Sequence, residues 1–266
     1  MKAPAPKKSL GQHFLFDPAL LRKIVTAAGV EPGERVLEIG PGPGGLTRAL
    51  AEAGARVLAL EADPRMVEHL APLVADGVRV LQGDALEADY EALAREAGGP
   101  FRLVANLPYN ITGPLLARLL RQREAFVSMT LMLQREVAER LVAAPGGRVR
   151  GRLSVLAQCF CRLRTVLRVP PGAFRPPPKV ESTVVRLDVL PTPLAPIDDE
   201  ERLWSLVRMA FGHRRKTLRN ALRGSAVELE SAFGAAGLTG AERPEQLTSL
   251  QWIALANAVV PEREGS

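Results

Sequence analysis

The stretch Val36-Leu-Glu-Ile-Gly-Pro-Gly-Pro-Gly-Gly-Leu-Thr47 decides the fold. Its apolar start predicts a strand that ends at Ile39. Gly40, Gly42, Gly44 and Gly45 then predict a turn into a helix, because glycine tolerates unusual backbone angles and lets a ligand approach the main chain. A strand, a glycine turn and a helix in this order are typical of an open α/β sheet with a nucleotide-like cofactor.

Short apolar runs alternate with helical stretches on both sides of this segment. The runs predict further strands at 56–60, 78–81, 101–105 and 127–133, and the stretches predict helices at 46–53, 63–74, 114–121 and 136–143. An earlier helix begins at Asp17-Pro18, a typical N-terminal cap, and ends at Gly29. This alternation predicts an α/β fold with a mostly parallel, Rossmann-like sheet that is covered on both faces.

The pattern changes after residue 143. Residues 165–169 and 183–189 predict two strands that form a β-hairpin at the edge of the sheet, separated by a proline-rich segment. Residues 191–196 are proline-rich without periodicity and predict a linker. From Asp198 onward the apolar residues recur with helical spacing. We therefore expect a first domain at 1–190, with a basic N-terminal arm, and a small all-helical domain at 198–266.

Three further features predict a cofactor site at the carboxyl ends of neighbouring strands, where α/β sheets bind ligands. Gly40, Gly42 and Gly45 fit the GxGxxG spacing of dinucleotide-binding proteins. Glu61 ends the second strand and can accept hydrogen bonds from two ribose hydroxyls, and Asp84 follows the third and can accept from an adenine amine. These residues suit NAD and S-adenosylmethionine equally, since both carry adenosine.

The fourth strand ends in Asn106-Leu107-Pro108-Tyr109, which favours S-adenosylmethionine. The lone pair of an adenine amine is delocalised into the ring, so the amine is a poor nucleophile. The Asn106 side-chain oxygen and the Leu107 carbonyl can accept its two hydrogens and direct the lone pair at a methyl group. Pro108 fixes the local backbone, and Tyr109 offers a face on which an extruded base can stack. A hydride-transfer enzyme has no evident use for this tetrapeptide.

With these motifs, the chain resembles the rRNA adenine N6-dimethyltransferases, specifically the bacterial small-subunit family called KsgA or RsmA. The resemblance covers nearly the whole chain and rests on residues 8–15, 38–44, 61, 83–85, 106–111, 151–155 and 174–180. It implies a class I methyltransferase fold in which His13 and Leu15 border the cofactor beside Gly40, Glu61, Asp84 and Asn106. It also implies that Tyr109 and Phe174 flank the target adenine. Arg150 departs from the pattern, because many relatives have an aromatic residue there.

Basic residues predict the RNA-binding surface. No acidic residue occurs between Glu139 and Glu181, or between Arg202 and Val227, while both stretches are rich in arginine. Arg215, Arg219 and Arg223 have a spacing of four, which would align them along one helix face. Such clusters are typical of phosphate contacts. The candidate RNA-binding residues are Arg148, Arg150, Arg152, Arg214, Arg215, Lys216, Arg219 and Arg223.

Composition limits the function classes. A net charge of +6 and a pI of about 9.8 indicate an anionic partner. No apolar run is long enough to span a membrane, and the N-terminus lacks a secretory pattern, so we expect a cytoplasmic protein. Cys159 and Cys161 lack the further ligands of a zinc site, and we expect no metal.

The resemblance implies a specific partner and reaction. The expected substrate is small-subunit rRNA in a pre-ribosomal 30S particle, dimethylated at N6 of two adjacent adenosines in a hairpin loop near its 3′ end, by an enzyme that we expect to be a monomer. Three alternatives stay open: a large-subunit rRNA methyltransferase, an NAD-dependent oxidoreductase, and a non-catalytic nucleic-acid-binding factor.

Overall fold

The computed structural model describes residues 4–6, 12–213, 215–223 and 229–259. The chain forms two compact units, each of which combines two segments. The first unit comprises Met1–Ala138 and Leu163–Val189, and the second comprises Glu139–Arg162 and Leu190–Ser266. The segment Glu139–Arg162 therefore folds with the C-terminal helices, although it falls within the predicted first domain, residues 1–190.

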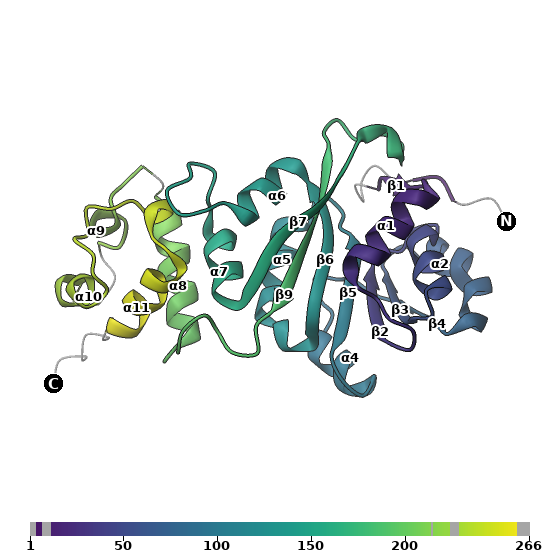
Figure 1. Ribbon diagram of the computed structural model, residues 1–266, viewed down its shortest axis with the longest axis horizontal. Helices are drawn as coiled ribbons and strands as arrows, with labels where there is room; N and C mark the ends of the chain where they lie inside the picture. Colours follow the sequence, from purple (N-terminus) through teal and green to yellow (C-terminus); the bar gives the residue numbers. More distant parts are fainter. Residues whose placement is uncertain (1–3, 7–11, 214, 224–228, 260–266) are drawn as a thin grey trace. The chain divides into compact units, whose positions relative to one another are not determined.

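The first unit contains a seven-stranded sheet with the order β4-β3-β2-β5-β6-β9-β7 (Figure 1). Strands β4, β3, β2, β5 and β6 are parallel, and β9 runs antiparallel to β6. The prediction of a mostly parallel sheet with an antiparallel addition at one side is confirmed. The strands are β2 (Arg35–Ile39), β3 (Arg56–Glu61), β4 (Val78–Gln82), β5 (Phe101–Asn106), β6 (Phe126–Gln134), β7 (Cys161–Val169) and β9 (Ser182–Val189).

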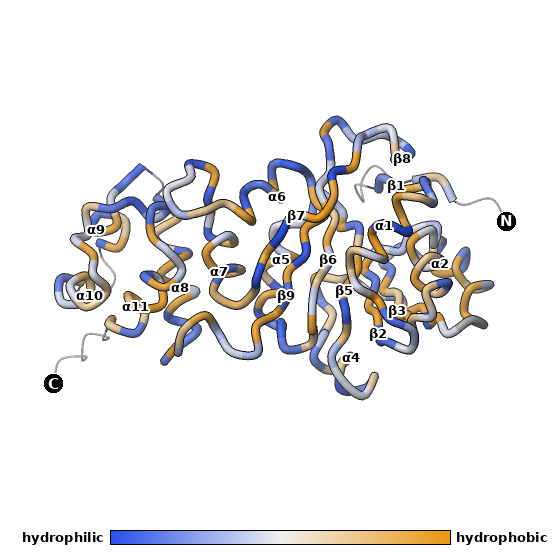
Figure 2. Tube along the Cα trace, viewed as in Figure 1, coloured by the Kyte–Doolittle hydropathy of each residue, from blue (hydrophilic) through white to orange (hydrophobic). Residues whose placement is uncertain are grey.

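Apolar side chains on both faces hold this sheet between helices. Val36 pairs with Val57 across β2 and β3, and both belong to a core cluster with residues of helices α1 and α2. Figure 1 shows α5 on the opposite face of the sheet from α1, and Figure 2 shows hydrophobic colour along much of the central strands. The helices of this unit are α1 (Pro18–Ala28), α2 (Gly45–Glu52), α3 (Pro64–Leu70), α4 (Tyr90–Glu96) and α5 (Thr112–Arg121), and the residues of α6 (Arg135–Val142) are divided between the two units.

Local sequence explains where the first helix begins and ends. The Asp17 side chain accepts hydrogen bonds from the backbone N–H groups of Ala19 and Leu20, as a helix cap does. Gly29 ends the helix with a left-handed φ of 63°. The predicted start and end of α1 are confirmed.

A second, two-stranded sheet ties the N-terminal segment to the proline-rich loop. Strand β1 (Phe14–Leu15) pairs antiparallel with β8 (Phe174–Arg175), so residues about 160 positions apart in the chain lie side by side. The Phe16 N–H donates to the Ala173 carbonyl at 3.3 Å and extends this pairing. The pairing holds residues 12–15, which we call the strap, at the carboxyl edge of the large sheet.

The second unit is built from helices around its own apolar core. Trp252, Leu203, Val207 and Phe233 are among its buried residues. Its helices are α7 (Arg152–Phe160), α8 (Glu200–Phe211), α9 (Leu218–Ala221), α10 (Leu229–Ala235) and α11 (Ser249–Ala258). Among the residues that the structure describes, no helix has the length and apolar character needed to cross a membrane.

Candidate functional site

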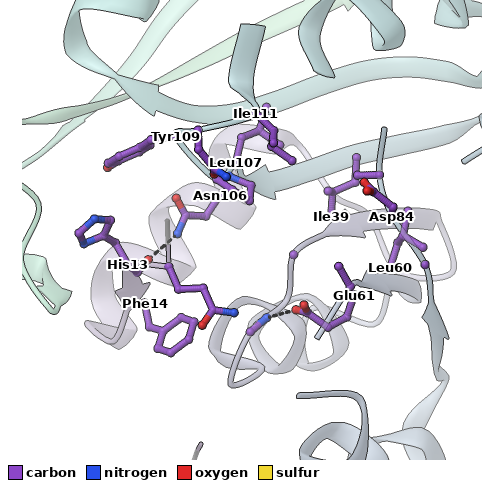
Figure 3. A pocket seen from close by; sticks show the side chains of 18 residues that line it. His13, Phe14, Ile39, Leu60, Glu61, Asp84, Asn106, Leu107, Tyr109 and Ile111 are labelled. Atoms are coloured by element: carbon purple, nitrogen blue, oxygen red, sulfur yellow. Dashed lines mark hydrogen bonds between the residues drawn. The ribbon is translucent and has the colours of Figure 1, made fainter. Parts of the chain in front are cut away.

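Four neighbouring parallel strands end around one cavity at the carboxyl edge of the sheet. This edge cavity has about 860 Å³ of space not filled by atoms, including its open mouth. Its lining includes Gln12, His13, Phe14, Ile39, Gly40, Gly42, Leu60, Glu61, Asp84, Asn106, Leu107, Pro108 and Tyr109 (Figure 3).

The glycine turn forms one wall of the edge cavity. Gly40 and Gly42 have φ angles of 68° and 53°, which disfavour any residue with a side chain. A Cβ atom on Gly42 would lie 2.8 Å from the ring of Phe14, so this glycine also makes room for the strap. The close approach between strap and turn explains why glycine is required there.

Glu61 joins the glycine turn to the end of β3. Its carboxylate accepts hydrogen bonds from the backbone N–H groups of Gly42, at 3.1 Å, and Asp63, at 2.8 Å. Burial raises the pKa of Glu61, while these two hydrogen bonds oppose the increase. Each carboxylate oxygen has a further lone pair, so Glu61 can still accept from ligand hydroxyls.

Asp84 lies at the far side of the same cavity, just beyond β4. Its side chain is exposed and accepts a hydrogen bond from the Leu86 N–H at 2.8 Å. The structure therefore brings Gly40, Gly42, Glu61 and Asp84 together around one space, as their order in the sequence predicts.

Glu38 was not among the predicted site residues. It is only 1% exposed and lines a smaller cavity beneath the glycine turn, together with Leu15, Gly40 and Asn106. Burial, with a smaller contribution from the nearby Glu61 charge, raises the pKa of Glu38 to about 8. An acidic residue within the apolar run 36–39 was the signal that could have identified it, since such a residue is rarely buried without a role.

Residues 106–109 begin at the last residue of β5, next to the strap. The Asn106 side-chain N–H donates to the His13 carbonyl at 2.9 Å (Figure 3). The Leu107 N–H donates to the Met132 carbonyl at 3.3 Å. Among the described residues, no donor contacts the Asn106 Oδ1 atom or the Leu107 carbonyl, so both oxygens can accept from a ligand.

Tyr109 borders both the edge cavity and a second one. Its hydroxyl group forms a 2.7 Å hydrogen bond with Ser182 Oγ, and its ring stacks on His13 with centroids 5.4 Å apart. The second cavity, which we call the loop cavity, is lined by Pro6, Gln12, His13, Tyr109, Gln134, Pro176, Pro177, Pro178, Lys179 and Val180. Gln12, His13 and Tyr109 are common to both cavities and therefore connect them.

Two residues proposed from the family resemblance lie elsewhere than expected. Phe174 is only 2% exposed, belongs to the core cluster and pairs with Leu15 in the small sheet. It lines neither the edge cavity nor the loop cavity, because its apolar ring is packed inside the first unit. Leu15 is buried as well and borders the smaller cavity that contains Glu38.

The structure corrects the predicted RNA contact of Arg150. This side chain is fully buried in the second unit, where its guanidinium donates to the Ala143 carbonyl, Gln158 Oε1 and Ser249 Oγ. A guanidinium with these internal partners is not presented to a phosphate. Its neighbours Arg148 and Arg152 are both exposed, as an RNA contact requires.

The basic stripe predicted along one helix is also wrong. Helix α9 spans only Leu218–Ala221, so Arg215 and Arg223 lie outside it. Arg219 forms an ion pair with Glu230 and donates to the Thr239 carbonyl. Arg215, Lys216 and Arg223 are exposed, whereas Arg214 lies outside the described residues.

The fold and the edge cavity together define an α/β enzyme of the methyltransferase class. A mostly parallel sheet presents a glycine turn, two acidic strand ends and the Asn106-Leu-Pro-Tyr segment around one space. The family model described as "Ribosomal RNA adenine dimethylase" matches residues 5–259. The chain belongs to this family.

Curated relatives are similar to this chain over nearly its full length. A protein of Magnetococcus marinus named "Ribosomal RNA small subunit methyltransferase A" is 44% identical over 97% of this chain and 93% of its own. A protein of the same name from Ruegeria pomeroyi is 49% identical over 94% of this chain and 91% of its own. These proteins and the family model agree with the family that the sequence motifs resemble.

Two solved structures share the fold over most of the chain. A dimethyladenosine transferase from Plasmodium falciparum has a TM-score of 0.73 and 26% identity, and covers 93% of this chain and 99% of its own. The 23S rRNA methyltransferase ErmE has a TM-score of 0.70 and 29% identity, and covers 92% of this chain and 99% of its own.

Proposed function

We propose that this enzyme uses S-adenosylmethionine to dimethylate N6 of two adjacent adenosines in a hairpin loop near the 3′ end of small-subunit rRNA. The observation that carries the proposal is the position of Asn106. Its side chain lies at the edge cavity, next to the glycine turn, and its Oδ1 atom is available as an acceptor. The small-subunit substrate follows from the names of the relatives that are 44–49% identical.

The residues of the edge cavity fit the cofactor. Glu61 would accept from the ribose hydroxyls and Asp84 from the adenine amine, while Gly40 and Gly42 allow close approach to the main chain. His13 and Asn106 would border the methionine end, and Leu15 would support this wall from the smaller cavity. When bound, S-adenosylmethionine supplies an activated methyl group, so the protein needs no strong general base.

The protein's task is to orient the adenine amine. Asn106 Oδ1 and the Leu107 carbonyl would accept its two hydrogens, which concentrates the lone pair on nitrogen and directs it at the methyl carbon. The methylated amine would lose its extra proton to water. Two preformed acceptors of this kind would accelerate methyl transfer, because they position the amine and stabilise the positive charge that develops on it.

The loop cavity is the proposed site of the flipped adenine. Tyr109 presents an aromatic ring between the two cavities, and stacking of a base on such a ring contributes about 1–3 kcal/mol. Pro108 stiffens the segment that carries the acceptors. Phe174 would take part only if the strap and the small sheet rearranged, because its ring is buried.

The RNA is proposed to contact exposed basic residues of the second unit. Arg148, Arg152, Arg215, Lys216 and Arg223 are exposed, and the proposal extends to Arg214 from its sequence alone. We further propose that the enzyme acts as a monomer in the cytoplasm, on an rRNA that is already part of a pre-ribosomal 30S particle. An unpaired loop suits this chemistry because its bases are easily extruded.

A large-subunit rRNA substrate is the second candidate, favoured by the similarity to ErmE. The deciding experiment incubates the enzyme and labelled S-adenosylmethionine with undermethylated small subunits or with large-subunit rRNA, and then maps the modified bases. We expect two dimethylated adenosines near the small-subunit 3′ end. Modification of large-subunit rRNA alone would contradict the proposal.

A further inference from the structure

The strap contacts both cavities of the site. Gln12 and His13 line the edge cavity and the loop cavity, and Phe14 lines the edge cavity. A segment in this position can influence the cofactor side and the base side at once.

Several contacts hold the strap in one place. Phe14 and Leu15 pair with Arg175 and Phe174, and the Phe14 ring fills the space that a Cβ atom on Gly42 would need. The His13 ring nitrogen Nδ1 lies 2.8 Å from the Pro176 carbonyl oxygen. These contacts come from the glycine turn on one side and from the proline-rich loop on the other.

The strap also contacts Asn106, the proposed acceptor. The His13 carbonyl accepts a hydrogen bond from Asn106 Nδ2 at 2.9 Å. A carbonyl oxygen can only accept, so it can pair with the NH₂ end of the amide and repels its oxygen end. The contact therefore fixes which way the Asn106 amide faces, and Figure 3 shows its oxygen turned away from His13.

We propose that the strap is a positioning element for methyl transfer: the His13 carbonyl holds the Asn106 amide so that Oδ1 faces the adenine amine, and Phe14 keeps that carbonyl in place. The inference rests on the proposed role of Asn106 as an acceptor. Phe14 is a positioning residue in this account, because it acts through the strap backbone. Without Phe14, the Asn106 amide can flip and present its two N–H donors to the adenine amine, which must itself donate.

Substitution of Phe14 tests the inference. Phe14→Ala empties the space beside Gly42, and Phe14→Leu keeps most of it filled. We expect Phe14→Ala to lower kcat by roughly tenfold or more at saturating cofactor and RNA, since small misplacements of a reacting group are costly. The KM for RNA should change little, and Phe14→Leu should recover most of the rate. Phe16→Ala is the matched control: that ring is 43% exposed and contacts Arg175.

A spectroscopic readout separates positioning from general damage. The chain has only four asparagines, at 106, 110, 220 and 257, so selective ¹⁵N labelling gives four pairs of side-chain amide signals, and the pair that is lost in Asn106→Ala belongs to Asn106. In the wild type, one Asn106 amide hydrogen should exchange slowly with solvent. In Phe14→Ala that protection should fall together with kcat.

Two results would overturn the inference. One is a loss of kcat in Phe14→Ala with the Asn106 hydrogen still protected; the other is a loss of protection with kcat unchanged. Full activity of Asn106→Ala would instead refute the proposed function itself, so the two failures are distinguishable. If Phe14→Ala does not fold, the same pair of measurements on Phe14→Leu and Phe14→Met decides the matter.

Discussion

Glu38 shows how burial controls a single carboxyl group of the site. The apolar run around it places it inside the sheet, and its environment raises its pKa to about 8. The unfolded chain has no such environment, so the pKa of its Glu38 is near the ordinary glutamate value of 4.5. Between these two pH values the folded protein retains a proton that the unfolded chain releases.

Stability should therefore fall as pH rises from about 4.5 to about 8, by up to about 1.4 kcal/mol per pH unit from this residue. Glu38→Gln removes the titration, so we expect the variant to gain stability relative to the wild type as pH increases through this window. Denaturant unfolding at pH 5 and pH 8 checks the prediction. An equal difference between the two proteins at both pH values would contradict it.

Sequence reasoning identified most of the site at this scale because strand ends are visible in a sequence. Glu61, Asp84 and Asn106 each follow a continuous apolar run, and the parallel sheet brings such ends together. Arg150 was misplaced because its charge predicts exposure, whereas its hydrogen-bond partners are up to 99 residues away. Phe174 was misplaced because its partner in the small sheet, Leu15, is 159 residues away in the chain.

At the scale of elements, the glycine turn and the strap depend on each other. Gly42 has a left-handed φ and also lies against Phe14. The sequence predicted the turn, because glycine spacing is a local signal. It did not predict β1, since two residues form a strand only where a distant segment pairs with them. Helices α4 and α7 were also missed, and only α7 lies outside the stretch of clear strand–helix alternation.

Gly42→Ala should separate these two roles when compared with Gly33→Ala. Both glycines have positive φ angles, but a Cβ atom on Gly33 would meet nothing within 4 Å. Each variant should lose about 1–2 kcal/mol of stability from backbone strain. Only Gly42→Ala should also weaken cofactor binding and slow methyl transfer, because it displaces Phe14. Calorimetric titration of the cofactor checks this, and equal binding by both variants would argue against the strap contact.

Arg150 is expected to stabilise the second unit. Arg150→Met removes the donor to Gln158 Oε1 and to Ser249 Oγ, while the Ala143 carbonyl keeps its hydrogen bond from the Gln158 side-chain N–H. Each buried polar group left unpaired costs about 1–3 kcal/mol. Arg152→Met, on the exposed surface of α7, should change stability by less than about 0.5 kcal/mol. Thermal unfolding compares the two variants. A similar melting temperature for both would show that the buried network contributes little.

At the scale of the whole molecule, charge should determine how tightly the enzyme holds RNA. The net charge of +6 attracts phosphates, and each phosphate contact releases counterions, so affinity should fall steeply with salt. Exposed arginines contribute to this salt dependence and buried arginines do not, because only an exposed side chain can reach a phosphate and displace its counterions.

The salt dependence of RNA binding should distinguish these classes. Arg148→Gln and Arg152→Gln should each lower the slope of log K against log salt by up to about 0.9. Arg150→Met should leave the slope unchanged in samples that are still folded, because its guanidinium faces inward. A reduced slope in Arg150→Met would place that side chain on the RNA after all.

The most direct test concerns Asn106, whose amide is proposed to hold the amine beside the methyl donor. Single-turnover methyl transfer and cofactor titration should be measured on Asn106→Ala. We predict a rate loss of about 10²–10³, the usual effect of removing one polar group that stabilises a transition state, with the fold and most of the cofactor affinity retained. Methyl transfer at the wild-type rate would contradict the account.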